Sequence, residues 1–219
     1  MSRIVRASDQ ALLVVFDDAI SRAASAAVRS LFAWLRDEPY AGIVDLHPAY
    51  GSLLVRFDAL RHESADIERE LARRLGSLAQ RPAPLARSYT IPVRYGGDDG
   101  CDLEPVAAAL GLTPSEVVRV HAGAAYEVAF VGFSPGFAYL LGLPERLATP
   151  RRATPRTAVP AGSVAIAGLQ AGIYPLPTPG GWQLIGRTDV RLFDAARPGA
   201  ALLAPGDLVR FVAAAGGPS

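Results

Sequence analysis

The stretch FVGFSPGFAYLLGLPERLATPRRATPRTAVPAGSVAIAGLQAGIYPLPTPGGWQLIGRT, residues 130–188, decides how the second part of this chain folds. Proline fixes φ and glycine admits positive φ, so closely spaced prolines and glycines hold loops in one shape. Large apolar residues between them, such as Phe137, Ile166 and Trp182, supply surface that a disordered segment would lack. The stretch therefore predicts rigid, functional loops between short strands.

Strand signals dominate the chain beyond residue 125. Apolar runs over 126–133, 163–167, 182–185 and 208–213 have strand length, and the segments between them contain too much proline and glycine for helices. Such a set of strands closes into a barrel or a sandwich, and spacing alone does not distinguish the two.

Two short helices are expected just before these strands. Asp102 marks a helix start after a strand over 90–94, and Gly111 stands just past the end of that helix. The sequence Thr113-Pro114-Ser115-Glu116 is a capping box with proline at the first helical position, so it opens the second helix.

The first part of the chain predicts a small two-layer domain in the order β-α-β-β-α. Apolar runs indicate strands over 11–16, 42–46 and 52–57, and spacings of three and four indicate a helix over 20–35. Ser64 is expected to cap a second helix.

The proline-rich segment 80–86 is the expected linker between two domains, residues 1–85 and 86–219. The predicted fold class is therefore α+β, with a small two-layer α/β sandwich followed by a β-rich domain.

The charged residues exclude several classes of function. Basic and acidic residues number 22 and 21, which gives a net charge of +1 and favours neither nucleic acid nor an anionic membrane as a partner. Every basic residue is arginine, so the chain has no lysine for a Schiff base, a pyridoxal-phosphate anchor or a P-loop. If ATP is used, we expect another chain to hold much of it.

Cysteine and histidine predict neither disulfide nor metal chemistry. The single cysteine, Cys101, fits a reducing compartment, and the three histidines have no metal-ligand spacing. His121 is expected at a helix end, where its imidazole would interact with the helix dipole in a structural rather than a catalytic role. The longest early apolar run is too short to cross a membrane, so a cytoplasmic location is expected.

No catalytic residue can be assigned. Residues 132–136, GFSPG, match the G-x-S-x-G pattern of a hydrolase nucleophile, but the residue after Ser134 is proline and has no N–H for an oxyanion. No two acidic residues have a spacing that indicates a pair for acid–base catalysis.

Arginines in the stiff loops are the candidate anion ligands, because a guanidinium fork there can be held ready for a carboxylate or phosphate. The alternative is that they face solvent or pair with Glu145 and Asp189. Neutral hydrogen bonds and apolar walls would complete the site, unless the aromatic residues are simply core. The candidates are Arg151, Arg152, Arg156, Arg187, Gln170, Tyr174, Gln183, Phe133, Phe137, Tyr139 and Trp182.

Several motifs resemble those of the B-subunit family of bacterial ATP-dependent 5-oxoprolinase. They are GFSPGFAYL (132–140), LATPRRATPRTAVPAGSVAIAG (147–168), GIYP (172–175) and PGGWQLIGRT (179–188). Similar proteins carry the names sporulation-kinase inhibitor and allophanate hydrolase subunit 1. The resemblance implies a cyclophilin-like β-barrel for residues 86–219.

The resemblance also implies a function. The chain would be one subunit of an enzyme that opens the 5-oxoproline lactam to L-glutamate with ATP hydrolysis, where phosphorylation of the carbonyl oxygen would activate a poor electrophile. It would act only with partners that resemble the A and C subunits of 5-oxoprolinase, and ATP and Mg would be bound jointly with a partner. Arg156 and Arg187 would orient substrate oxygens, assisted by Gln170 and Tyr174.

Two alternatives remain at this point. The chain could be a regulatory module that inhibits a sensor histidine kinase through an exposed apolar patch around Phe137, Tyr139 and Trp182. It could also be the carboxyltransferase-type half of an allophanate- or urea-metabolising complex.

Overall fold

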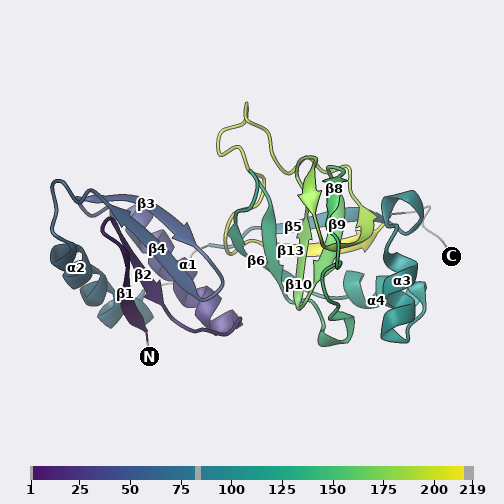
Figure 1. Cartoon of the computed structure of the whole chain (residues 1–219), viewed down its shortest axis with the longest axis horizontal. Helices are drawn as coiled ribbons and strands as arrows, with labels where there is room; N and C mark the ends of the chain where they lie inside the picture. The colour runs from purple at the N-terminus through teal and green to yellow at the C-terminus, as the bar shows by residue number, and fades with distance from the viewer. Residues whose placement is uncertain (1, 82–84, 215–219) are drawn as a thin grey trace. The chain divides into compact units, whose positions relative to one another are not determined.

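The computed structural model in Figure 1 describes residues 2–81 and 85–214. The chain divides into two compact units, Met1–Leu85 and Ala86–Ser219. The predicted linker over 80–86 includes residues 82–84, which lie outside the described residues.

The first unit is a four-stranded antiparallel sheet with two helices packed on one face (Figure 1). The sheet has the order β1-β2-β4-β3. Alternate residues of the central strands, such as Leu12, Val14 and Val55, face the helices because side chains along a strand alternate between its faces. The elements are β1 Arg3–Ser8, β2 Ala11–Val15, α1 Arg22–Asp37, β3 Ile43–Pro48, β4 Ser52–Phe57, α2 Ser64–Ser77 and a short 3₁₀ turn, Leu78–Gln80.

Two details of the first unit differ from the sequence prediction. Strand β1 was missed because its residues are polar and mostly exposed, so no apolar run marks it; pairing with β2 fixes it. Ser64 is the first residue of α2 and not its cap, and the N-cap is Glu63, which makes no side-chain capping bond.

The second unit contains a closed seven-stranded barrel in the order β10-β7-β6-β13-β5-β12-β9. Strands β8 and β11 form a separate two-stranded sheet. The α+β prediction, a two-layer unit followed by a barrel, is confirmed. The elements are β5 Ser88–Tyr95, α3 Leu103–Leu110, α4 Pro114–Ala122, β6 Tyr126–Val131, β7 Ala138–Leu141, β8 Arg156–Val159, β9 Ser163–Ala167, β10 Gln170–Ile173, β11 Thr178–Gly180, β12 Gln183–Arg187 and β13 Leu208–Ala213, with 3₁₀ turns at Gly97–Asp99 and Glu145–Leu147.

The predicted boundaries of the two short helices are confirmed. Gly111 follows α3 in the left-handed region, with φ of 65°. The capping box at α4 is formed in both directions, because Thr113 Oγ1 accepts from the Glu116 N–H and the Glu116 carboxylate accepts from the Thr113 N–H. Asp102 is the N-cap of α3, but its side chain makes no capping bond and serves the site described below.

The predicted position of His121 at a helix end is confirmed, and the structure adds that its ring is buried and neutral there. His121 lies in the last turn of α4, but its ring is fully buried and stacks on Phe211 with 4.6 Å between ring centroids. Its Nδ1 lies 2.7 Å from the Tyr95 hydroxyl, and Tyr126 also contacts the ring. Burial lowers the pKa of His121 to about 3, so the folded chain holds a neutral imidazole.

A buried neutral histidine makes stability depend on pH. In the folded state His121 stays neutral down to about pH 3, whereas in the unfolded chain it takes up a proton below about pH 6.5. The free energy of unfolding should therefore fall on acidification from pH 6.5 to 5, by up to about 1.4 kcal/mol per pH unit. Urea unfolding at several pH values measures this slope.

The variant His121→Phe should remove most of that slope, because it removes the titrating group. The control His47→Gln replaces an exposed histidine and should keep the slope. Equal slopes in the wild type and His121→Phe would contradict the assignment.

Candidate functional site

An aromatic pocket of about 260 Å³ lies in the barrel unit. The loop after β6, strand β7, the segment before β8, and the residues around β11 all contribute to it. Its lining residues are Phe133, Phe137, Tyr139, Arg151, Pro155, Tyr174, Pro179, Gly180, Gly181 and Trp182.

The aromatic rings of the pocket pack edge to face around Phe137. The Phe137 ring centroid lies 4.9 Å from that of Tyr139, 5.1 Å from that of Tyr174 and 5.6 Å from that of Trp182. Edge-to-face pairs of this kind place the positive edge of one ring against the negative face of another. The walls of the pocket are therefore fixed by packing before any ligand enters.

Two glycines allow these rings to approach the backbone. A Cβ at Gly180 would lie 2.4 Å from the Tyr174 hydroxyl, and a Cβ at Gly172 would lie 2.8 Å from the Phe137 ring. Both distances are shorter than van der Waals contact, so any larger residue would displace a wall of the pocket.

The loop between β6 and β7 presents Phe133 at the edge of the pocket. Phe133 has φ of 69°, which is unusual for a non-glycine residue, and 62% of its surface is exposed. The turn is closed by the Ser134 N–H donating to the Gly132 carbonyl at 2.8 Å and by the Phe137 N–H donating to the Ser134 carbonyl at 3.0 Å. The G-x-S-x-G match is thus a tight turn that supplies two aromatic walls.

The polar groups of the pocket favour an anionic ligand. The Arg151 guanidinium lies over the Trp182 ring, 5.9 Å from its centroid, and no carboxylate is among the lining residues. Burial raises the pKa values of Tyr139 and Tyr174, so both phenols stay neutral and can donate hydrogen bonds. One cation and two hydroxyl donors against aromatic walls suit a small molecule with a carboxylate or phosphate.

A buried carboxylate, Asp102, ties the segment beside the pocket to the barrel. Asp102 Oδ1 accepts from Arg156 at 2.7 Å and from Arg152 at 3.1 Å, and Oδ2 accepts from the Leu184 N–H at 2.7 Å. The Asp102 N–H in turn donates to the Leu184 carbonyl at 2.9 Å. The carboxylate thereby joins α3, β12 and the start of β8.

Arg156 lies next to the pocket without being one of its lining residues. Its strand partner in β11 is Gly180, and the preceding residue, Pro155, is also a lining residue. The Arg156 guanidinium also contacts Cys101 Sγ at 3.2 Å, and its pKa is raised by the hydrogen bond to Asp102. Arg156 is therefore a fixed cation at the back of the pocket wall.

The structure gathers part of the predicted site in this pocket. Phe133, Phe137, Tyr174, Trp182 and Arg151 line it together with Tyr139. Their binding of substrate stays a prediction.

The other predicted ligands lie elsewhere in the barrel unit. Arg187 Nε donates to the Ala161 carbonyl at 3.0 Å, and Gln183 Nε2 donates to the Pro150 carbonyl at 3.0 Å. Gln170 begins β10, whereas Tyr174 follows the other end of that strand. The expected alternative partner Asp189 pairs with Arg94.

The prediction of an exposed apolar patch at Phe137 and Trp182 is wrong. These side chains are 2% and 5% exposed because they pack against each other inside the aromatic cluster. Tyr139 is half-buried, and Phe133 is the aromatic residue of this site that faces solvent.

Sequence reasoning missed Asp102 as the partner of the arginines. The sequence pointed only to a helix start at this position, and its charge partners lie 50 and 54 residues further along the chain. No local pattern reports a contact at that separation.

Removal of the Asp102 carboxylate should destabilise the barrel unit, because it leaves the Leu184 N–H and two guanidinium groups without their acceptor. We expect Asp102→Ala to lower the free energy of unfolding by about 3 kcal/mol and Asp102→Asn, which keeps an oxygen acceptor, by about 1–2 kcal/mol. Urea denaturation followed by tryptophan fluorescence measures both.

The matched control is Asp189→Ala, which removes an exposed carboxylate that also pairs with an arginine. It should cost less than about 1 kcal/mol. Equal losses in Asp102→Ala and Asp189→Ala would overturn the assignment of Asp102 as a structural hub.

Comparisons with known proteins identify the family. Residues 2–203 match the family described as carboxyltransferase domain, subdomain C and D. The chain is 38% identical over 220 residues to the 5-oxoprolinase B subunit of Bacillus subtilis (strain 168), and the match covers 96% of this chain and 92% of that protein. It is 56% identical over 129 residues to the 5-oxoprolinase B subunit of Escherichia coli O157:H7, where the match covers 59% of each chain.

A solved structure, that of TTHA0988, has the same fold over nearly the whole chain. It is 40% identical with a TM-score of 0.83, and the match covers 94% of this chain but only 40% of the TTHA0988 chain. More than half of that structure thus lies outside the match. Together with the sequence matches, these findings show that this chain belongs to the 5-oxoprolinase B-subunit family.

Proposed function

We propose that this chain is a non-autonomous subunit of an ATP-dependent 5-oxoprolinase, which converts 5-oxoproline to L-glutamate in the cytoplasm. The observation that carries the proposal is the aromatic pocket with one guanidinium and no lining carboxylate, in a chain of the 5-oxoprolinase B-subunit family.

The pocket suits 5-oxoproline in size and chemistry. The substrate is a small five-membered ring with one carboxylate, and the ring would lie among the aromatic side chains that line the pocket. Its carboxylate would pair with Arg151, and a neutral phenol of Tyr139 or Tyr174 would donate to the lactam carbonyl. Removal of the ring from water would strengthen both polar contacts.

We further propose that ATP and Mg bind in a site that a partner subunit completes. The sequence has no lysine, and across residues 2–81 and 85–214 no three His, Cys, Asp or Glu side chains are placed to hold a metal ion.

The partners we propose are two proteins that resemble the A and C subunits of 5-oxoprolinase. The B-subunit names of the relatives support this proposal, because a B subunit belongs to an assembly with other subunits. The extra polypeptide in TTHA0988, which extends well beyond the match, is in keeping with a module that functions beside further protein.

The family description supports a second candidate function, that of a carboxyltransferase. A carboxyltransferase role would make the same pocket bind a carboxylated carrier. Stimulated turnover of a biotinylated carrier by this chain, without ATP-dependent glutamate release, would favour that function.

Reconstitution from purified subunits tests the proposal. Glutamate release from 5-oxoproline and ATP should require this chain, and Arg151→Ala should raise the KM for 5-oxoproline about tenfold or more, because an uncompensated carboxylate binds weakly. The matched control Arg191→Ala removes an arginine that pairs with Asp194 away from the pocket and should leave KM unchanged. Release of glutamate at the full rate without this chain would refute the proposal.

No helix among residues 2–81 and 85–214 combines the length and apolarity that crossing a bilayer requires.

A further inference from the structure

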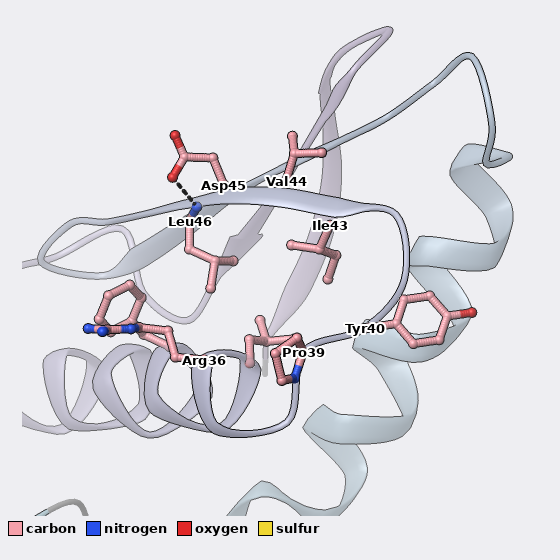
Figure 2. A pocket seen from close by; sticks show the side chains of 9 residues that line it. Arg36, Pro39, Tyr40, Ile43, Val44, Asp45 and Leu46 are labelled. Atoms are coloured by element: carbon pink, nitrogen blue, oxygen red, sulfur yellow. Dashed lines mark hydrogen bonds between the residues drawn. The ribbon is translucent and has the colours of Figure 1, made fainter.

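A second hollow lies in the first unit, at the open edge of its two layers. Figure 2 shows this groove between α1 and β3, and its volume is about 310 Å³. Ile43 and Leu46 point from β3 toward α1, whereas Val44 and Asp45 point away from the helix (Figure 2). The groove exists because β3 is an edge strand, so no further strand covers the space between sheet and helix on this side.

The floor of the groove is apolar and incompletely buried. Leu35 is buried, but Phe32, Tyr40, Ile43 and Leu46 are only partly covered by the rest of the unit. A contact that removes their exposed apolar surface from water would stabilise a complex. The groove is open along its length, so it can take several side chains of an extended polypeptide segment.

The rim carries a cation without a counter-charge. Arg36 lies in the last turn of α1, and its guanidinium lies 5.5 Å from the centroid of the Phe32 ring. Among the described residues it makes no ion pair, in contrast to Arg56, Arg74 and Arg81 of the same unit. Stacking on Phe32 restrains the guanidinium, so it is oriented before a partner arrives.

The carboxylates near Arg36 are held by other groups. Asp45 accepts from the Leu46 N–H and pairs with His47 and Arg56. Glu38 accepts from Trp34 Nε1 and from Arg81. Asp37 is the next residue along α1, and adjacent residues on a helix do not face each other. Arg36 is exposed to solvent, so its guanidinium can pair with a carboxylate of another polypeptide.

The occupant is not an added β-strand. Strand β3 has a bulge between Ile43 and Asp45, where its pairing with β4 shifts, and it ends on Pro48. A bulge and a proline both disfavour the pairing of another strand with an edge. The groove can instead take side chains, which enter between α1 and β3.

We propose that this groove docks a segment of a partner subunit that presents apolar side chains together with an Asp or Glu. The apolar side chains would cover Phe32, Ile43 and Leu46, and the carboxylate would pair with Arg36. This inference rests on the proposed function, which requires partner subunits, and it assigns the contact to the first unit of the chain.

The affinity of the full chain for the two purified partner proteins, the A-type and the C-type, tests the proposal. Arg36→Glu should weaken binding to one of them about tenfold or more, and the difference from the wild type should shrink at high salt. Pro39→Glu, at an exposed position that lines the groove next to α1, should weaken the same complex. Thermal unfolding confirms that each variant is folded.

The matched control is Arg6→Glu, which makes the same charge change on β1, the opposite edge of the sheet. It should leave both affinities within twofold of the wild type. A cross-link gives an independent measurement: with Cys101→Ser removing the one native thiol, Pro39→Cys carries a single cross-linker at the groove. The cross-linked partner peptide should contain apolar residues and an Asp or Glu.

The possible results separate the two proposals. Wild-type affinity of Arg36→Glu and Pro39→Glu in a complex that releases glutamate would overturn the docking site and leave the proposed function standing. Altered self-association of the isolated chain, with unchanged affinity for both partner proteins, would assign the groove to a second copy and also overturn the proposal. Failure of the wild type to bind either partner or to support glutamate release would refute both the docking site and the proposed function.

Discussion

The buried carboxylate of Asp102 holds the loop-rich part of the barrel unit in place. It stands just before α3, accepts a backbone hydrogen bond from β12 and binds the guanidinium groups of Arg152 and Arg156. Burial of a carboxylate is costly unless its oxygens are satisfied, and three donors here satisfy both of them. The segment that contains the pocket residues Arg151 and Pro155 is therefore held by the contacts of Arg152 and Arg156 with Asp102.

Aromatic packing fixes the walls of the pocket, as the ion pairs of Asp102 fix the segment beside it. Phe137 contacts Tyr139, Tyr174 and Trp182, and close glycines such as Gly180 let these rings approach the backbone. The pocket has rigid apolar walls and few polar groups, and those groups are a cation and neutral phenols. An electrically neutral protein can bind an anion in this way, because the local distribution of charge decides affinity and the net charge of +1 does not.

Each of the two units contains a hollow lined by aromatic side chains and an arginine. We propose that the pocket of the barrel unit binds a small anionic ring and that the groove of the first unit binds a polypeptide segment. Both use an arginine stacked on an aromatic ring, Arg151 on Trp182 and Arg36 on Phe32. Because this chain has no lysine, all of its cationic contacts are made by guanidinium groups, which stack on rings as well as form ion pairs.

The sequence by itself determined the order of most elements, the α+β class and the aromatic residues and arginine of the pocket. These properties are local, since apolar periodicity, the capping box at Thr113 and Glu116, and the glycines and prolines of 130–188 act over a few residues. Only the tertiary structure decided that Asp102 binds Arg152 and Arg156, that Arg187 and Gln183 bond to backbone carbonyls, and that His121 is buried and neutral. The physical reason is sequence separation: the partners of these groups lie far along the chain, and only closure of the barrel brings them within hydrogen-bonding distance.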